Sequence, residues 1–341
     1  MINLVMIARN EERCLERCLK SVQGLVDEII LVDTGSTDRT KEIAASYGAK
    51  LYEFVWRDDF SAARNYALDQ SDADWNLILD ADEYLTEGSG ADMQSYLQKQ
   101  DHLGAIMIRN AYEDDHEISY GTNYTTRLLP RGVRYCGRIH EQADSHLPRI
   151  RLPWVFDHDG YLQPHKAERN LPLLLEELRE NPQDPYYLYH VASTLRESDG
   201  RKALPYYELF YQEVPDGANY RVRGVVGYLY TLMECKEFEK ALQFIQQEEE
   251  NLSKYADFEF FCGIFFLKLL LLDTRRYIEY LPRIEASYLH CLEIGEIPEH
   301  GGVLGTGSFK AAYNLGAWYE ATGDLKKADN YYQLSKNMRN E

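Results

Sequence analysis

The sequence up to Glu83 alternates short apolar runs with amphipathic helical patterns, and this alternation constrains the fold more than any other feature. Continuous β-rich runs separated by single helices are typical of a parallel sheet that helices cover on both faces. The runs are INLVMIA, EIILVD, KLYEFVW and WNLILD, starting at residues 2, 28, 50 and 75, with helical patterns at 11–22, 37–47 and 61–68. We therefore expect a doubly wound α/β domain.

Polar residues follow three of these runs, at 9–11, 33–36 and 80–82. In open parallel sheets, ligands bind beyond the carboxyl ends of the strands. The three segments are therefore expected to converge on one edge of the sheet.

The pattern changes after Leu103. The segments AIMIRN, TTRLLP and VRYCGRIH indicate strands added antiparallel to the same sheet. Beyond HDGYLQPHKAERN the chain is almost wholly helical in pattern, and NPQDP at 181–185 marks the change. We place the boundary between an α/β domain, 1–163, and an all-α domain, 164–341.

The helical part ends in AYNLGAWYEATGDLKKADNYYQL, whose spacing is that of a tetratricopeptide unit. The matching residues are Leu315, Gly316, Tyr319, Gly323, Ala328 and Tyr332. Earlier pieces around Ala203 and Ala241, 241 − 203 = 38 residues apart, are degenerate copies. An ordinary helical bundle is the alternative for these middle units. The apolar stretch 260–272 contains Lys268 and is shorter than the roughly 20 residues of a membrane span, so we expect a buried helix.

The formal net charge of −19 argues against broad binding to nucleic acid or to an anionic membrane surface. The six cysteines are scattered, and the first residues lack the basic lead of a signal peptide, so we expect a cytoplasmic protein. Cys14 and Cys18 are four residues apart on a helical pattern. A shared metal is conceivable there, but two neighbours on one buried helix face are the favoured interpretation.

Three carboxylates lie within four residues at the end of WNLILDADE. Asp80 and Asp82, two residues apart at the end of a buried strand, would repel each other in one crevice unless a cation were bound. Hard oxygen ligands suit Mg²⁺ or Mn²⁺, which also bind substrate phosphates. The alternative is that the carboxylates are solvated at the surface.

The motifs IARNEE, VDTGSTD, DFSAARN and LDADE, in this order between Ile7 and Glu83, resemble the nucleotide-binding half of family-2 glycosyltransferases. GRIHEQ at 137–142, DHDGY at 157–161 and the tetratricopeptide-like helices are similar to a bacterial subgroup that includes the sublancin-type peptide S-glycosyltransferases. The resemblance implies a GT-A fold, which is Rossmann-like with a mostly parallel sheet, for the first domain.

The resemblance also implies how the donor is bound. Ala8, Arg9 and Glu11 match the loop that lies against uridine, and Asp33 matches the acid that contacts the nucleoside. Many relatives carry a second acid where this chain has Thr34, so the contact with uracil departs from the pattern.

Arg64 and Asn65 match the helix start that reaches the nucleotide, where a guanidinium would offset diphosphate charge. A salt bridge of Arg64 with Asp58 or Asp59 is the structural alternative.

For the metal, the resemblance implies that Asp82 is a ligand and that Asp80, before Ala81 in the same donor-binding motif, faces ribose or metal-bound water. His158 falls where this fold often supplies a further ligand, and an imidazole would shift the preference from Mg²⁺ toward Mn²⁺. A hydrogen-bonded structural histidine is the alternative. Glu83 is either a contact to sugar hydroxyls or a loop acid.

Relatives of this type invert the anomeric carbon, which requires a base on the acceptor side. Glu141, preceded by His140, is the candidate, and a structural hydrogen-bonded pair is the alternative. Asp157 and Asp159 are secondary candidates.

The expected partners are a UDP-sugar that donates a hexose and an acceptor, favoured to be a Cys, Ser or Thr side chain of a peptide. The helical domain would present this acceptor or join two copies in a homodimer. A surface glycan or lipid-linked saccharide is the alternative acceptor. A helical-repeat scaffold without catalysis is the alternative function.

Overall fold

The computed structural model describes residues 1–93, 96–114, 117–160 and 166–340. The chain divides into two compact units, Met1–Leu173 and Leu174–Glu341. The expected boundary between residues 163 and 164, and Tyr161 of the DHDGY motif, lie outside the described residues, so the finer boundary stays a prediction.

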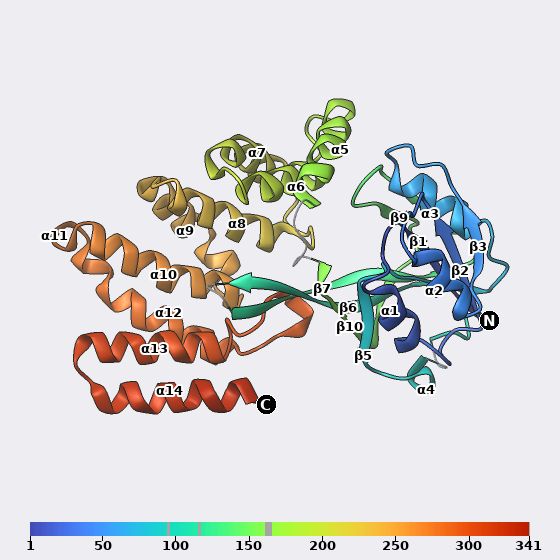
Figure 1. The fold of residues 1–341 in the computed structure, drawn as a ribbon. Helices are drawn as coiled ribbons and strands as arrows, with labels where there is room; N and C mark the ends of the chain where they lie inside the picture. Colours follow the sequence, from blue (N-terminus) through green and yellow to red (C-terminus); the bar gives the residue numbers. More distant parts are fainter. Residues whose placement is uncertain (94–95, 115–116, 161–165, 341) are drawn as a thin grey trace. The chain divides into compact units, whose positions relative to one another are not determined.

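The first unit is built on a mixed sheet whose strands run in the order β3-β2-β1-β4-β7-β6-β10-β5 (Figure 1). The strands β1 to β4 that follow the predicted alternation are mutually parallel, whereas β7 joins both β4 and β6 antiparallel. The bounds are β1 Ile2–Ala8, β2 Glu28–Asp33, β3 Lys50–Glu53, β4 Trp75–Ile78, β5 Glu83–Glu87, β6 Leu103–Asp114, β7 Glu117–Pro130 and β10 Arg149–His158. The predicted α/β architecture is therefore confirmed.

Helices cover both faces of this sheet because successive residues of each strand point to opposite sides. Leu4 and Met6 of β1 belong to a core that includes α1 and α2, whereas Val5 belongs to the core formed with α3. The helices of this unit are α1 Leu15–Ser21, α2 Thr40–Ser46, α3 Phe60–Leu68 and α4 Gly90–Met93. Burial on both faces explains why the strands are apolar throughout.

The segment VRYCGRIH does not extend the main sheet, and this prediction was wrong. Its strand β8, Arg134–Cys136, pairs with β9, Gln142–Asp144, in a separate two-stranded sheet. Gly137 and His140 have φ values of +87° and +49°, so the chain turns back after Cys136 instead of continuing as a strand. Residues 137–141 therefore form a loop beside the main sheet.

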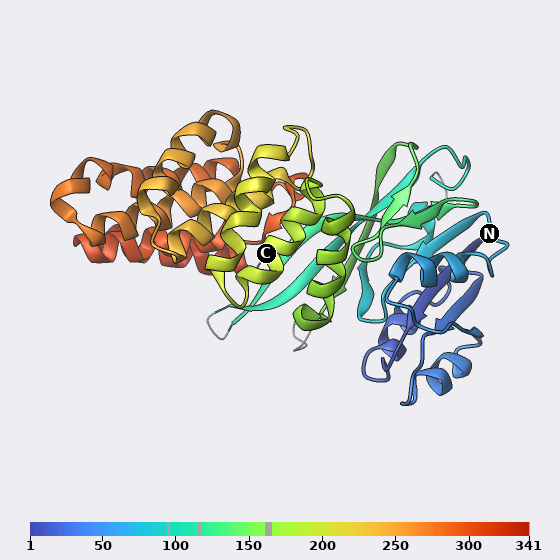
Figure 2. The ribbon, with the colours of Figure 1, turned by 90° about the horizontal axis from the view of Figure 1, so that it is seen from above.

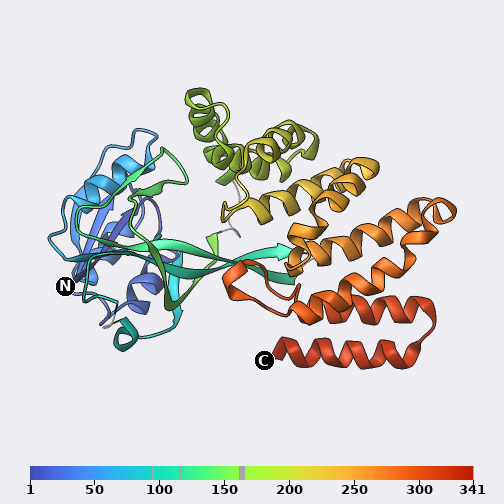
Figure 3. The same cartoon turned by 180° about the vertical axis from the view of Figure 1, so that it is seen from behind.

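The second unit is predominantly helical, and its helices lie side by side as successive antiparallel hairpins (Figures 2 and 3). From residue 166 onward the helices are α5 Lys166–Glu180, α6 Pro185–Arg196, α7 Gly200–Glu213, α8 Arg221–Glu234, α9 Phe238–Leu252, α10 Ala256–Leu272, α11 Thr274–Tyr277, α12 Leu281–Ile294, α13 Phe309–Thr322 and α14 Leu325–Asn340. Short 3₁₀ turns, Ile278–Tyr280 and Pro298–His300, and a two-residue strand, β11 Gly302–Val303, interrupt them.

Glycines let these helices approach one another beside aromatic rings. A Cβ on Gly316 would lie 2.6 Å from Cδ1 of Tyr332, which confirms the close crossing that the sequence predicts for α13 and α14. The same device recurs between α7 and α8, where a Cβ on Gly224 would lie 2.2 Å from the ring of Phe210. Close helix packing of this kind is what a stacked helical repeat requires.

The apolar stretch 260–272 lies within α10, as predicted, and buries Phe261, Phe265 and Phe266. Within the described ranges, the helices are too short or too polar to cross a membrane.

Candidate functional site

The ends of β1 and β2 are tied together at one edge of the sheet. Thr34 N donates to the carbonyl of Ala8 at 2.9 Å, and Asn10 N donates to Ser36 Oγ at 3.0 Å. Asn10 adopts a φ of +58°, a region that asparagine tolerates better than most residues. Because β1 also pairs in parallel with β4, the three polar segments follow strands that end at this same edge, as predicted.

Asp33, at the end of β2, is 3% exposed and holds the turn that follows it. Its Oδ2 accepts hydrogen bonds from the backbone amides of Gly35 and Ser36, at 3.0 and 2.9 Å. Its Oδ1 is buried and has no hydrogen-bond partner among the described residues. An unpaired buried carboxylate oxygen is costly, so this atom is poised for an external donor.

The side chains of the loop after β1 differ in their surroundings. Arg9 is exposed, and Ala8 is buried at the strand end. Glu11 Oε2 accepts a hydrogen bond from the thiol of Cys14, at 3.1 Å. Burial raises the pKa of the Cys14 and Cys18 thiols, so both stay protonated and neutral, Cys14 directly before α1 and Cys18 on its buried face.

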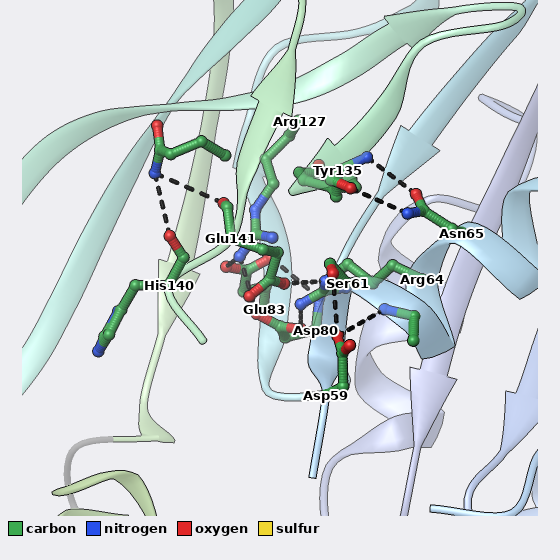
Figure 4. Close-up of polar contacts among 12 residues, drawn as sticks. Asp59, Ser61, Arg64, Asn65, Asp80, Glu83, Arg127, Tyr135, His140 and Glu141 are labelled. Carbon is green, nitrogen blue, oxygen red and sulfur yellow. Dashed lines mark hydrogen bonds and ion pairs between the residues drawn. The ribbon is translucent and has the colours of Figure 1, made fainter. Parts of the chain in front are cut away.

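Arg64 on α3 points toward the end of β4 and is 6% exposed. Its Nη2 donates to Asp80 Oδ1 at 2.6 Å, and its Nε donates to Oε1 of Glu141 (Figure 4). Asp59 instead caps α3 by accepting from Ala62 N at 2.8 Å, so the alternative pairing of Arg64 with this aspartate is not seen. Arg64 thus links the end of β4 to the 137–141 loop.

Arg127 on β7 binds the same aspartate from the other side and was missed in the sequence. Its Nη2 donates to Asp80 Oδ2 at 2.8 Å and also to Oε1 of Glu83 (Figure 4). Glu83 Oε2 accepts from Asp80 N at 3.0 Å. The single cation in the strand end TTRLLP was the available signal, but its target lies 47 residues away in the chain.

The pKa values of the Asp80 and Glu83 carboxyls shift in opposite directions. Burial acts to raise the pKa of Asp80, but the charges of Arg64 and Arg127 outweigh it and hold the pKa well below its usual range. Burial raises the pKa of Glu83, and the neighbouring charge of Asp80 adds to this effect. Asp80 is therefore the firmly ionised member of the pair.

Asp82 and His158 form a second pair at this site. Asp82 Oδ2 lies 3.3 Å from His158 Nε2; the side chain of Asp82 is buried and that of His158 is partly buried. His158 Nδ1 lies 2.8 Å from Asn110 Oδ1, while Asn110 Nδ2 donates to Asn123 Oδ1 at 2.7 Å. Because that donor orients the Asn110 amide, the amide oxygen faces Nδ1 of His158 as an acceptor, and Nε2 faces Asp82.

The structure brings Asp82 and His158 together but directs Asp80 elsewhere, since both of its oxygens accept from arginines. Across the residues that the structure describes, His, Cys, Asp and Glu side chains do not gather in threes or more around a potential ion site. A direct contact between Asp80 and a metal thus stays a prediction.

The remaining predicted residues have structural contacts. Asn65 exchanges hydrogen bonds with the backbone of Tyr135, at 2.9 and 2.8 Å, and so fixes β8 against α3. The ring of His140 points away from the carboxylate cluster, whereas Glu141 points into it (Figure 4). Burial lowers the pKa of His140.

Asp157 and Asp159, the secondary candidates, are bound by arginines. Arg109 Nε donates to Asp157 Oδ1 at 2.6 Å, and Arg17 Nη2 donates to Asp159 Oδ2 at 2.7 Å. Both contacts flank His158 and so hold the end of β10.

Comparison with known proteins agrees with this geometry. Residues 4–135 match the family model described as Glycosyl transferase family 2. A TPR repeat-containing protein of Synechococcus elongatus is 35% identical over 59% of this chain and 54% of its own length. The SPbeta prophage-derived glycosyltransferase SunS of Bacillus subtilis is 22% identical over 85% of this chain and 64% of its own length.

The chain therefore spans 54% and 64% of the lengths of these two curated relatives. Among solved structures, TarS of S. aureus aligns with a TM-score of 0.40 and 14% identity, covering 73% of this chain and 91% of that chain. The matched range of the family model contains β1 from Leu4 onward, β2 to β4, the three strand-end segments and Arg127. The N-terminal unit thus carries a match to the glycosyl transferase family 2 model.

Proposed function

We propose that the chain is a metal-dependent, inverting glycosyltransferase that moves a hexose from a UDP-sugar to an acceptor. The observation that carries the proposal is that Asp80 and Glu141 meet on the buried Arg64, and Asp82 meets His158, at the strand ends of a family-2 domain. Each part of the reaction has side chains suited to it.

Asp33 is suited to the nucleoside. With Oδ2 held by two backbone amides, the free and buried Oδ1 is a fixed acceptor for an N–H group such as that of uracil. Thr34 donates both its amide and its hydroxyl to the carbonyl of Ala8, so it braces the turn and does not replace a second acid.

Asp82 and His158 fit a divalent cation. With Nδ1 donating to Asn110, Nε2 lies 3.3 Å from a carboxylate oxygen of Asp82, and loss of any proton on Nε2 would give one nitrogen and one oxygen ligand. The surrounding charge agrees, since the carboxyls of Asp80, Asp82, Glu83 and Glu141 outnumber the guanidinium groups of Arg64 and Arg127. Mn²⁺ or Mg²⁺ bound there would act as a Lewis acid toward the leaving diphosphate.

Glu141 is suited to the acceptor side. During transfer, the acceptor atom bonds to the anomeric carbon, the bond from this carbon to the diphosphate breaks with its electron pair, and the acceptor proton goes to a base. The pair with Arg64 holds the Glu141 carboxylate in place for this role, and we do not assign a proton transfer to His140, whose ring points away.

For the acceptor we propose a Cys, Ser or Thr side chain of a peptide, on the basis of the sequence resemblance described above. A thiol, with an unperturbed pKa of about 8.5, would ask little of Glu141, whereas a hydroxyl would depend on it. Intact-mass analysis of candidate peptides after incubation would show a hexose-sized increase, and an increase only on saccharide or lipid would replace this acceptor.

The function is tested by replacing Asp82 with alanine and measuring UDP release from UDP-sugars in the presence of Mn²⁺. We expect a fall of about 1,000-fold, because a metal ligand and its charge are removed. Asp92→Ala, at an exposed position on α4, is the matched control and should leave turnover unchanged. Equal turnover in the two variants would remove the proposed metal site.

A further inference from the structure

A β-bulge lies in β7 beside the site. Leu128 pairs with Gly104 of β6, but the next residue of β6, Ala105, pairs with Thr126. Arg127 is therefore the extra residue of the bulge, without a partner of its own in the ladder with β6. Bulges of this kind redirect a side chain, and they are frequent next to active sites.

Packing fixes the bulge in place. A Cβ on Gly104 would lie 2.4 Å from Leu152 Cδ1 and 2.8 Å from Leu128 Cβ, so this position accepts only glycine without a shift of its neighbours. Leu128 is also held from the other side, where it pairs with Leu77 of β4. The packing of Gly104 and Leu128 thus keeps the bulge in place. The bulge leaves Arg127 without a pairing partner on β6 and directs its side chain toward Asp80 and Glu83.

The contacts of Arg127 are those of a bridge between two acids. One nitrogen, Nη2, serves both Asp80 and Glu83, and Nε is buried without a hydrogen-bond partner among the described residues. Arginine–carboxylate pairs frequently use two nitrogens on one carboxylate, and Arg127 instead divides one nitrogen between two carboxylates. With Arg64 on Oδ1 and Arg127 on Oδ2, the plane of the Asp80 carboxylate is fixed instead.

We propose that Arg127 is a positioning residue for donor binding, aimed by the bulge to orient Asp80 and the turn that carries Asp82. The inference rests on the proposed function. Glu83 closes the turn by accepting from Asp80 N, and Arg127 holds Glu83 in that position. Asp82 lies inside this closed turn, so the contacts of Arg127 set the direction from which Asp82 meets His158.

The test compares Arg127→Gln, Arg127→Lys and the double variant Arg127→Gln with Glu83→Gln. UDP affinity with Mn²⁺ is measured by calorimetry, and the melting temperature is measured on the same samples. Arg127→Gln alone leaves Glu83 buried and unpaired, so we expect a lower melting temperature together with about 10-fold weaker UDP binding. The double variant removes the unpaired acid and should recover the melting temperature while its UDP binding stays about 10-fold weaker.

Arg127→Lys keeps the charge but replaces the fork by a point donor, and it should retain the wild-type melting temperature with a UDP affinity between those of wild type and Arg127→Gln. The inference would be overturned if the double variant bound UDP as tightly as wild type, because Arg127 would then only neutralise Glu83. If the double variant does not fold, wild-type UDP affinity in Arg127→Lys would overturn it instead. Absence of Mn²⁺-dependent UDP binding in the wild-type protein would instead remove the proposed function, and this inference with it.

Discussion

Each unit of the molecule buries an arginine–carboxylate cluster, but the two clusters match their charges differently. In the helical unit, Arg221 binds both oxygens of Glu248, at 3.0 and 2.7 Å, and the hydroxyl of Tyr211 donates to the same carboxylate at 2.6 Å. In the α/β unit, Arg64 and Arg127 are each divided between two acids.

Arg221 and Glu248 match one buried cation to one buried carboxylate, because the other acid near Arg221, Asp216 at 3.4 Å from Nε, is 99% exposed. Arg64 and Arg127 instead share three carboxylates, those of Asp80, Glu83 and Glu141, so that the acids outnumber the cations. Unpaired nitrogens do not distinguish the two clusters, since Nη1 of Arg64, Nε of Arg127 and Nε of Arg221 all lack hydrogen-bond partners among the described residues. We infer that burial of an ion pair does not mark a site by itself, whereas an excess of acids at a strand edge is expected of a site that binds a cation.

The largest effect should come from Arg64→Met, which removes one of the two arginines on Asp80 and the arginine on Glu141. We expect turnover to fall about 1,000-fold, because Glu141 loses its fixed position and Asp80 keeps only the contact with Arg127. Steady-state UDP release at a temperature where the variant is folded measures it, with Arg39→Met, at an exposed position, as the control. Turnover within threefold of wild type would mean that the shared arginine is merely structural.

Glu248→Gln should have the opposite profile. Removing one partner of the buried pair leaves Arg221 uncompensated and should lower the free energy of unfolding by about 4 kcal/mol. UDP release by the folded protein should not change. Urea unfolding measures the loss, and Glu250→Gln, exposed on the same helix, is the control. If the fully folded Glu248→Gln protein released UDP more slowly than wild type, the interpretation of this cluster as purely structural would be contradicted.

Asp257 provides a third case, a buried carboxylate bound by Val303 N and Thr306 Oγ1 instead of an arginine. Burial raises its pKa to about 6, in contrast to the lowered pKa of Asp80. The fold therefore favours the protonated form. Protonated Asp257 therefore stabilises the folded state fully below about pH 4, the pKa of this carboxyl in the unfolded chain. This stabilisation is lost as the pH rises through about 6, its pKa in the folded state.

Asp257→Asn should consequently gain stability over wild type between pH 4 and pH 7, by up to about 3 kcal/mol. Unfolding free energies of both proteins across this range measure the difference. A difference that is constant with pH would show that the carboxyl is not perturbed by burial.

The smallest effect should come from Asn110→Ala, which removes the acceptor for Nδ1 of His158. Loss of such a supporting contact typically weakens metal binding by about 10- to 100-fold. Titration of UDP binding with Mn²⁺ measures it. Asn123→Ala, one hydrogen bond further out, should weaken Mn²⁺ binding less. Equal Mn²⁺ dependence in Asn110→Ala and wild type would remove the proposed tautomer of His158.

The parts of this picture that depend on local pattern were predictable from the sequence. The apolar runs gave β1, β2 and β4, and the polar residues after them gave Asp33, Asp80 and Asp82 at one edge. The alternation of strand and helix patterns is enough to predict this part of the fold, because parallel strands joined by single helices can be arranged in only a few topologies.

The parts that depend on long-range register were not predictable. Arg127 reaches Asp80 only because β7 inserts beside β4 and carries a bulge, and Asn110 reaches His158 only because β6 and β10 align in parallel. The strand β8 lies outside the main sheet because the chain turns back after it, with positive φ at Gly137 and His140. The conformational preference of histidine alone does not predict a positive φ at residue 140.

The central claim is that Asp82 and His158 hold a divalent ion through which UDP binds. Calorimetric titration of the wild-type protein with UDP, in Mn²⁺ and then in a chelator, tests it most directly. We expect the affinity for UDP to fall at least about 100-fold when Mn²⁺ is removed. Equal UDP affinity in the two conditions would contradict it.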